Sequence, residues 1–167
     1  MNKNILHREV VARAPLRISF AGGGTDVPPY PQQFGGAALN ATINRYAYCT
    51  VTDGDNDVIK VTSYDLEQSA EFATAVVPEF DGNLDLVKAV FRRINIDDLR
   101  PMDITLHCDA PPGSGLGSSS AIVVALICAL AKFLGVALSR HELAHIAYLV
   151  EREDVGIAGG FQDHYAT

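Results

Sequence analysis

The sequence contains no tryptophan, and its 13 Lys and Arg residues are outnumbered by 20 Asp and Glu residues. The resulting formal net charge of −7 argues against a protein that coats nucleic acid, because nucleic-acid phosphates demand a basic surface. The charge leaves room for a single phosphate site, since a few backbone amides are enough to hold one anion. We therefore expect no nucleic-acid partner.

Cysteine is also scarce. Cys49, Cys108 and Cys128 lie far apart, are odd in number and form no C-x-x-C pair. This spacing argues against both a disulfide framework and a zinc site. Free cysteines are typical of a reducing compartment, so we expect a cytoplasmic protein.

The sequence lacks a long apolar segment. Residues 1–9 are polar and mixed in charge, and no apolar segment of a signal peptide follows them. The longest apolar run, residues 121–131, is too short to cross a bilayer. We expect this run to lie in a buried core helix, and we expect no membrane partner.

Apolar residues nevertheless make up 48% of the 167 residues, which is enough for the core of one domain. Four segments are expected to form strands: 10–20, 37–53 (as one or two strands), 58–64 and 102–110. Helices are expected after Asn83, over 118–134, and after a capping box of Ser139 and Glu142. Prolines at 28, 29 and 31 predict irregular chain there. Since the strands come first and the helices later, the expected class is α+β.

The most specific motif lies between an expected strand and an expected helix. It reads Pro111-Pro112-Gly113-Ser114-Gly115-Leu116-Gly117-Ser118-Ser119-Ser120-Ala121. Glycines let the backbone curl closely around a ligand, and a helix N-terminus offers unpaired amides and the positive end of its dipole. This combination favours a phosphate site, and the serine hydroxyls could also ligate magnesium.

Other interpretations of this loop fit less well. A strand-to-helix turn with serine caps is the simplest, since short glycine motifs also occur by chance. A Rossmann loop needs an acidic residue about 20 residues further on, and none occurs between Asp109 and Glu142. A Walker loop ends in Gly-Lys followed by Ser or Thr, and no lysine is present in this loop.

The loop resembles the second motif of the GHMP kinases, a family of small-molecule kinases in which it wraps the phosphates of ATP. The resemblance implies a nucleotide site made of Pro112, Gly113, Ser114, Gly115, Leu116, Gly117, Ser118, Ser119 and Ser120. It also implies that Ser119 helps to hold magnesium. The family's N-terminal domain is similar to the second domain of ribosomal protein S5, a sheet covered by helices, and we expect that fold here.

The run from Arg13 to Asp26 resembles the family's first motif. Its Gly-Gly-Gly-Thr-Asp segment is similar to the segment shared by the branch of the family that phosphorylates D-glycero-D-manno-heptose 7-phosphate. The resemblance implies sugar contacts from Gly24, Thr25, Asp26 and, further along, Gly160. Without the resemblance, Asp26 would be interpreted as a residue that stabilises a turn, which is a common role.

Two acidic residues near the end of the sequence match family positions. The resemblance implies that Glu151 is a magnesium ligand and that Asp163 is the catalytic aspartate. A metal neutralises charge on the transferred phosphate, and an acceptor orients and deprotonates the sugar hydroxyl. Arg17 would lie beside Asp163, where a cation favours the ionised carboxylate. We expect the neighbouring Glu153 and Asp154 to form a solvated helix end.

A competing motif is His141-Glu142-Leu143-Ala144-His145, which matches the H-E-x-x-H zinc pattern. Short motifs of this kind often occur by chance, and the expected capping box already accounts for Glu142. We therefore favour the kinase interpretation.

The resemblance covers nearly the whole sequence but lacks the third, glycine-rich motif that the family carries in a C-terminal domain. We expect residues 1–167 to be the N-terminal, ATP-binding domain of a truncated chain, whose exposed apolar surface favours self-association. The expected reaction is ATP- and magnesium-dependent phosphorylation of a sugar, first of all at the anomeric hydroxyl of heptose 7-phosphate. Fucose- and galactose-type kinases, an isoprenoid decarboxylase, a non-catalytic sensor and an inactive fragment are the alternatives.

Overall fold

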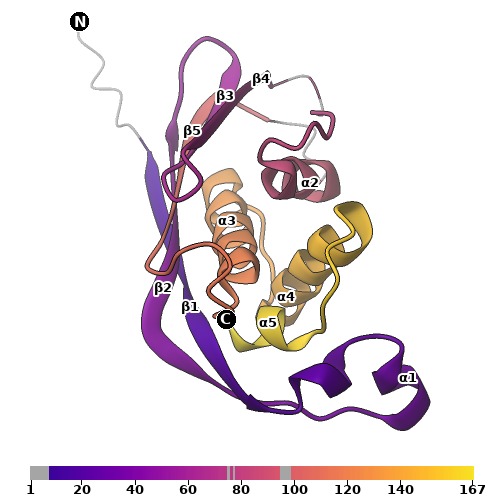
Figure 1. Ribbon diagram of the computed structural model, residues 1–167. Coiled ribbons are helices and arrows are strands. Elements are labelled where there is room, and N and C mark those ends of the chain that lie inside the picture. Colours follow the sequence, from indigo (N-terminus) through magenta and orange to yellow (C-terminus); the bar gives the residue numbers. More distant parts are fainter. Residues whose placement is uncertain (1–7, 75, 77, 95–98) are drawn as a thin grey trace, which may run out of the picture.

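The computed structural model describes residues 8–74, 76, 78–94 and 99–167, so the first seven residues of the polar N-terminal segment lie outside the described part. One layer is a five-stranded sheet and the other is a group of helices on one of its faces (Figure 1). None of the described helices is both long and apolar enough to span a membrane.

The sheet has the strand order β1-β2-β5-β3-β4. The strands are β1 (Glu9–Ala21), β2 (Leu39–Asp53), β3 (Val58–Ser63), β4 (Gln68–Ala73) and β5 (Met102–Cys108). Neighbouring strands are antiparallel except β3 and β5, which are parallel. The four expected strands are confirmed, with 37–53 as one strand. Strand β4 was not expected, because its mostly small and polar residues carry little alternation of apolar side chains.

The helices α2 (Asp85–Ile94), α3 (Ser118–Leu134), α4 (Arg140–Leu149) and α5 (Gln162–Ala166) lie on the same side of the sheet (Figure 1). Helix α3 packs directly on β1 and β2 and also contacts α2, α4 and α5. It is apolar nearly all round because it is enclosed on both sides. Its predicted start and end are confirmed, and so is the capping box of Ser139 and Glu142 that begins α4.

The predicted cap of α2 was wrong. Asn83 does not cap the helix, because its side-chain amide donates to the backbone oxygen of Ser69 at 3.1 Å. The carboxylate of Asp85 instead accepts hydrogen bonds from the amides of Asp81 (3.1 Å) and Gly82 (3.0 Å). The turn before the helix is therefore closed by the first helical residue rather than by the predicted cap.

Helix α4 continues into one π-helical turn, η2 (Val150–Asp154). The amide of Val155 donates to the oxygen of Val150 at 3.2 Å, five residues back. A π turn widens the helix and changes the direction of the side chains on it, and such turns occur frequently at functional sites. In this turn the side chain of Glu151 points inward and has no exposed surface.

The expectation that Glu153 and Asp154 form a solvated helix end was wrong for Asp154. Its two carboxylate oxygens accept from Nε and Nη2 of Arg93 on α2 at 2.8 and 2.7 Å. Glu153 makes a weaker contact of 3.2 Å with the same guanidinium. This two-point ion pair ties η2 to α2 and so fixes the turn that carries Glu151.

The connection from β1 to β2 is more ordered than its prolines predict. It contains a 3-10 turn, η1 (Gly23–Asp26), and a single helical turn, α1 (Tyr30–Phe34). Neither contains a buried residue. The connection projects from the end of the β1–β2 hairpin, away from β3 and β4 (Figure 1).

Candidate active site

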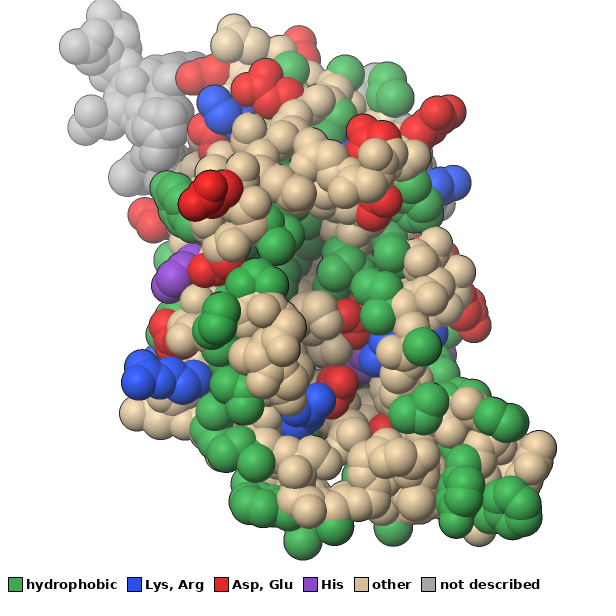
Figure 2. Space-filling model, viewed as in Figure 1, with side chains coloured by type: hydrophobic (Ala, Val, Ile, Leu, Met, Phe, Trp, Pro, Cys, Tyr) green, Lys and Arg blue, Asp and Glu red, His purple; other side chains and the backbone are tan. Residues whose placement is uncertain are grey.

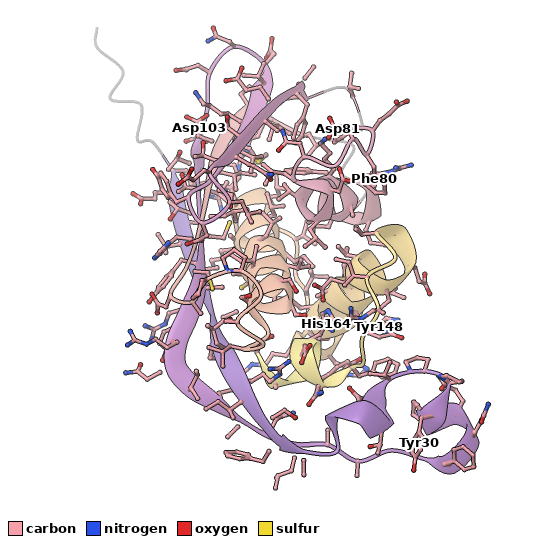
Figure 3. The ribbon with its side chains drawn as sticks, in the orientation of Figure 1. Tyr30, Phe80, Asp81, Asp103, Tyr148 and His164 are labelled. Carbon is pink, nitrogen blue, oxygen red and sulfur yellow. The ribbon has the colours of Figure 1, made fainter. Side chains whose placement is uncertain are left out.

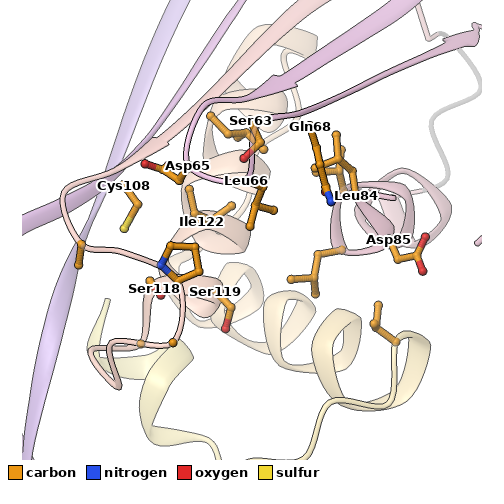
Figure 4. Close-up of a pocket in the computed structure, with 18 of the residues that line it drawn as sticks. Ser63, Asp65, Leu66, Gln68, Leu84, Asp85, Cys108, Ser118, Ser119 and Ile122 are labelled. Carbon is orange, nitrogen blue, oxygen red and sulfur yellow. The ribbon is translucent and has the colours of Figure 1, made fainter. Parts of the chain in front are cut away.

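A cavity of about 570 Å³ opens between the sheet, α2 and the start of α3, and it is named here the phosphate cavity after the predicted phosphate loop that lines it. The visible face of the molecule is hollowed between apolar side chains at its middle (Figure 2). Leu66, Leu84 and Ile122 line one part of the cavity, and Ser118 and Ser119 line another (Figure 4). The cavity therefore joins an apolar region to a polar loop.

The loop between β5 and α3 is shaped by its glycines. Gly113, Gly115 and Gly117 have φ values of 77°, 73° and 74°, in the left-handed region that other residues rarely adopt. Helix α3 begins directly after them, with no side chain capping its first turn. Its first amides are thus available to an anion, as the sequence predicts.

The predicted nucleotide residues divide into two groups. Those that line the phosphate cavity are Pro112, Gly113, Gly115, Gly117, Ser118 and Ser119. Ser114, Leu116 and Ser120 do not line it. Leu116 packs against the core, and Ser120 is 1% exposed behind the loop.

Arg17 connects this loop to Asp163. Its Nε and Nη2 contact Oδ1 of Asp163 at 2.7 and 2.5 Å, and its Nη1 donates to the oxygen of Gly115 at 2.6 Å. Its backbone amide donates to the oxygen of Leu116 at 3.0 Å. Both contacts to the carboxylate use Oδ1, and no hydrogen bond from the described residues engages Oδ2. One oxygen of Asp163 is therefore free beside the loop.

Glu151 lies behind the same loop and is fully buried. Ser120 Oγ donates to its Oε2 at 2.6 Å, and Nε2 of His164 contacts the same oxygen. Burial by itself would raise the pKa of Glu151, but the hydrogen bonds from His164 and Ser120 outweigh it and hold that pKa below its ordinary value. Oε1 has no hydrogen-bond partner among the described residues.

A second pocket of about 260 Å³ lies between the start of β2 and α5, and it is named here the sugar-side pocket after Asp26, the predicted sugar contact that lines it. It is lined by Asp26, Ala38, Asn40, Phe161, Gln162, Tyr165 and Ala166. Oδ2 of Asp26 accepts a hydrogen bond from the amide of Gln162 at 2.7 Å. A Cβ atom on Gly160 would lie 2.0 Å from this oxygen, so only glycine allows so close an approach.

Comparison with known proteins identifies the family. Residues 84–167 match the family model described as "GHMP kinases N terminal domain". The chain belongs to the GHMP kinase family. The expected α+β fold is thereby confirmed as that of a GHMP kinase N-terminal domain.

Individual GHMP kinases resemble the chain over nearly all of its length. It is 41% identical over 163 residues to the D-glycero-alpha-D-manno-heptose 7-phosphate kinase of Campylobacter jejuni, covering 96% of this chain and 48% of that protein. Two solved structures are also similar. A D-glycero-D-manno-heptose 1-phosphate kinase from Bacteroides thetaiotaomicron is 42% identical, with a TM-score of 0.88, over 94% of this chain and 52% of that one.

The second solved structure is a putative sugar kinase from Campylobacter jejuni. It is 38% identical, with a TM-score of 0.84, over 98% of this chain and 51% of that one. The chain thus spans about half the length of the relatives that it matches.

Within this GHMP kinase chain, several predicted sugar residues hold the loop rather than line the sugar-side pocket. Thr25 Oγ1 donates to the oxygen of Gly22 at 2.8 Å and accepts from the amide of Ala37 at 3.1 Å. Gly24 and Gly160 do not line the pocket either. Of the predicted group, Asp26 does line it.

Sequence reasoning missed several residues of both sites. Asn40, Gln162 and Tyr165 line the sugar-side pocket, and His164 binds Glu151. The sequence predicted Ser120 as a nucleotide residue, whereas its hydroxyl donates to Glu151 in the structure; the predicted magnesium ligands, Ser119 and Glu151, stay a prediction. The sequence did hold one signal for these residues: Gln162, His164 and Tyr165 are close neighbours of Asp163. Using it would have required a prediction of helix α5, which carries all four residues.

The competing zinc motif gains no support from the geometry. His141 and His145 are exposed on α4. The carboxylate of Glu142 accepts from the amide of Ser139 at 2.8 Å, as its capping role requires. Among the described residues, no group of three or more His, Cys, Asp or Glu side chains is arranged to hold a metal ion.

Proposed function

We propose that the whole protein is an ATP-dependent kinase that phosphorylates a sugar hydroxyl. The observation that carries this proposal is the Arg17–Asp163 pair beside the glycine-rich loop. In this arrangement one carboxylate oxygen of Asp163 is left free, and Asp163 lines the same cavity as the start of α3. Transfer of a phosphate to a sugar hydroxyl needs such an arrangement, because a free carboxylate oxygen can accept the proton of the hydroxyl while the amides at the start of α3 hold the phosphates.

The phosphate cavity fits a nucleoside triphosphate. Its loop and the start of α3 supply amides for the phosphates, and its apolar part suits a base. Leu66, Leu84 and Ile122 lie in that apolar part (Figure 4). We assign the base to this part and the phosphates to the loop.

The residues behind the loop fit a magnesium ion. A buried carboxylate oxygen without a partner costs about 1–3 kcal/mol, and Oε1 of Glu151 is in that state among the described residues. A hard cation would satisfy it, and the exposed Ser119 hydroxyl is a second oxygen ligand of the preferred kind. When bound, the ion would neutralise charge on the phosphates. Glu151 and Ser119 are therefore the residues proposed to hold it.

The chemical step follows from the position of Asp163. The sugar oxygen attacks the terminal phosphorus of ATP, and the bond from that phosphorus to the bridging oxygen breaks, which releases ADP. Oδ2 of Asp163 accepts the proton of the attacking hydroxyl and later releases it to water. Arg17 holds Oδ1, so that the carboxylate keeps its orientation during the transfer.

The sugar-side pocket supports a polyhydroxylated substrate. Asp26, Asn40 and Gln162 offer hydrogen bonds to hydroxyls, and Phe161 and Tyr165 offer aromatic faces. The similar proteins are named as heptose 7-phosphate and heptose 1-phosphate kinases. We propose that the group that receives the phosphate is the anomeric hydroxyl of D-glycero-D-manno-heptose 7-phosphate. Among the described residues, no Lys or Arg lines the pocket, so the 7-phosphate would extend beyond it.

A phosphotransfer screen of the whole protein tests the proposal. The panel contains heptose 7-phosphate, heptose 1-phosphate, galactose, fucose and mevalonate, with labelled ATP and with Asp163→Asn as the control. We expect magnesium-dependent transfer to heptose 7-phosphate, and phosphorus NMR of the product identifies the modified position. Transfer to no sugar, or equal transfer by Asp163→Asn, would refute the kinase assignment.

The compartment is a separate proposal. Cys49, Cys108 and Cys128 are all free thiols in the structure. Free thiols support a reducing environment, and we propose the cytoplasm. Labelling of Cys128, which is exposed, in intact cells would show whether its thiol is reduced there.

A further inference from the structure

Three side chains from different elements meet behind the phosphate loop. Ser120 comes from the first turn of α3, Glu151 from η2 and His164 from α5. Their exposed fractions are 1%, 0% and 0%. Both Ser120 Oγ and His164 Nε2 contact the same oxygen, Oε2 of Glu151. Burying these polar groups costs more than filling the same space with apolar side chains, which favours a role for the cluster beyond packing.

The ring of His164 has a defined orientation. The ring of Tyr148 meets it edge to face, with centroids 5.8 Å apart and planes at 86° (Figure 3). Nδ1 is buried and has no partner among the described residues. A buried N–H without a partner is costly, so the proton belongs on Nε2, which then donates to Glu151. The nearby guanidinium of Arg152 lies 3.7 Å from Oε2 and donates to the backbone oxygens of Ile157 and Gly160.

The two oxygens of Glu151 are thus in different states. Oε2 is occupied by Ser120 and His164, whereas Oε1 has no partner among the described residues. Ser119, which neighbours this carboxylate, lines the phosphate cavity. The hydrogen bonds on Oε2 therefore fix which oxygen of the carboxylate remains available.

We infer that His164 is a positioning residue that, together with Ser120, holds Oε2 of Glu151 and leaves Oε1 for the magnesium ion of the nucleotide. This inference rests on the proposed role of Glu151 as a magnesium ligand. His164 directly follows Asp163 on α5, so one short helix positions both the proton acceptor and the metal carboxylate. Partners of this kind orient a metal ligand, and their loss typically costs about 10–100-fold in metal affinity.

A matched pair of variants of the whole protein tests the inference. Gln at position 164 keeps a donor at a reach similar to that of Nε2, whereas the shorter Asn does not reach Oε2. ATP affinity is measured by calorimetry with magnesium and again with EDTA, and the ratio of the two affinities is the magnesium enhancement. We expect His164→Asn to lower this enhancement about 10-fold or more, and His164→Gln to keep most of it. ATP affinity in EDTA stays unchanged in both.

Two controls separate the inference from the proposed function. His145→Gln changes an exposed histidine on α4 and should leave the enhancement as in wild type. Glu151→Gln should abolish the enhancement. If Glu151→Gln abolishes it while both His164 variants retain it, the positioning role is refuted. If Glu151→Gln itself retains the enhancement, the magnesium role of Glu151 fails instead. Equal losses in the Asn and Gln variants, with equal melting temperatures, would also overturn the inference.

Discussion

The phosphate cavity and the sugar-side pocket differ in how firmly their polar groups are held. Arg17 comes from strand β1, is 8% exposed and binds Asp163 and the loop. Asp26 comes from η1, a short turn with no buried residue, and one backbone amide holds its carboxylate. The groups proposed for phosphate transfer are thus rooted in the core, whereas those proposed for sugar binding lie on a surface connection.

This contrast matches the different demands on the two sites. Phosphate transfer depends on fixed geometry, because a small displacement of a catalytic group costs a large part of the rate. Substrate selection is the property that varies among proteins of one fold, and surface connections tolerate variation better than core strands do. Substitutions in the two regions should therefore alter different kinetic constants.

The largest effect is expected for Asp163→Asn. The amide keeps the shape of the side chain but cannot accept the proton, so turnover should fall about 10²- to 10⁴-fold while the sugar KM changes much less. Steady-state kinetics with the best sugar of the panel measures both constants. A thermal melt is the control, and near-wild-type turnover in a folded Asp163→Asn protein would contradict the mechanism.

The opposite kinetic pattern is expected for Asp26→Ala. Hydrogen bonds to a charged group contribute about 1.5–3 kcal/mol, so the sugar KM should rise about 10- to 100-fold with little change in turnover. Gly160→Ala should act in the same direction, because its Cβ would lie 2.0 Å from Oδ2 of Asp26 and displace it. A fall in turnover without a rise in sugar KM would remove Asp26 from the sugar-side assignment.

A smaller effect is expected for Asp154→Asn. The ion pair with Arg93 is only partly exposed and uses both carboxylate oxygens, so its loss should lower the free energy of unfolding by about 1 kcal/mol. Denaturant titration measures this change. Glu153→Gln is the matched control, because Glu153 is mostly exposed and contacts the same guanidinium only at 3.2 Å. Equal destabilisation by the two changes would contradict the anchoring of η2 through Asp154.

The smallest effect concerns the capping box of α4. Hydrogen bonds from the side chain and backbone of Ser139 hold the pKa of Glu142 below its ordinary value of 4.5. A carboxylate with a lowered pKa in the folded state stabilises the fold above its ordinary pKa, and this contribution is lost as pH falls through the folded value. The difference in melting temperature between wild type and Glu142→Gln should therefore be largest near pH 7 and should shrink as the pH falls below 4.5. A difference that is independent of pH would contradict the capping role.

Much of the fold follows from local patterns. The bounds of α3 follow from its flanking glycines and continuous apolar run, and the capping box from the spacing of Ser139 and Glu142. Strand β4 and helix α5 were missed, since one has little apolar alternation and the other has only five residues. The π turn of η2 has no local sequence signal, because the Arg93–Asp154 pair that anchors it joins residues 61 positions apart.

The candidate site was predictable to a different degree. The family motifs gave the loop, Arg17, Glu151 and Asp163, and the structure brings these groups together. They could not give the partners of Glu151, because the contacts of Ser120 and His164 depend on the packing of three helical elements. Motifs therefore predict which residues belong to the candidate site, whereas the orientation of each side chain depends on tertiary packing.

The position of β5 has a consequence for the order of folding. It is the last strand in the sequence, yet it lies between β2 and β3 and joins the β1–β2 hairpin to the β3–β4 hairpin. Each hairpin pairs two strands that follow one another in the sequence, whereas the sheet is completed only when residues 102–108 insert between the hairpins. On a ribosome the sheet would therefore close only after residues 102–108 have emerged. Truncating the buried Ile104 should slow refolding more than truncating Val11 on the edge strand, as stopped-flow measurements would show.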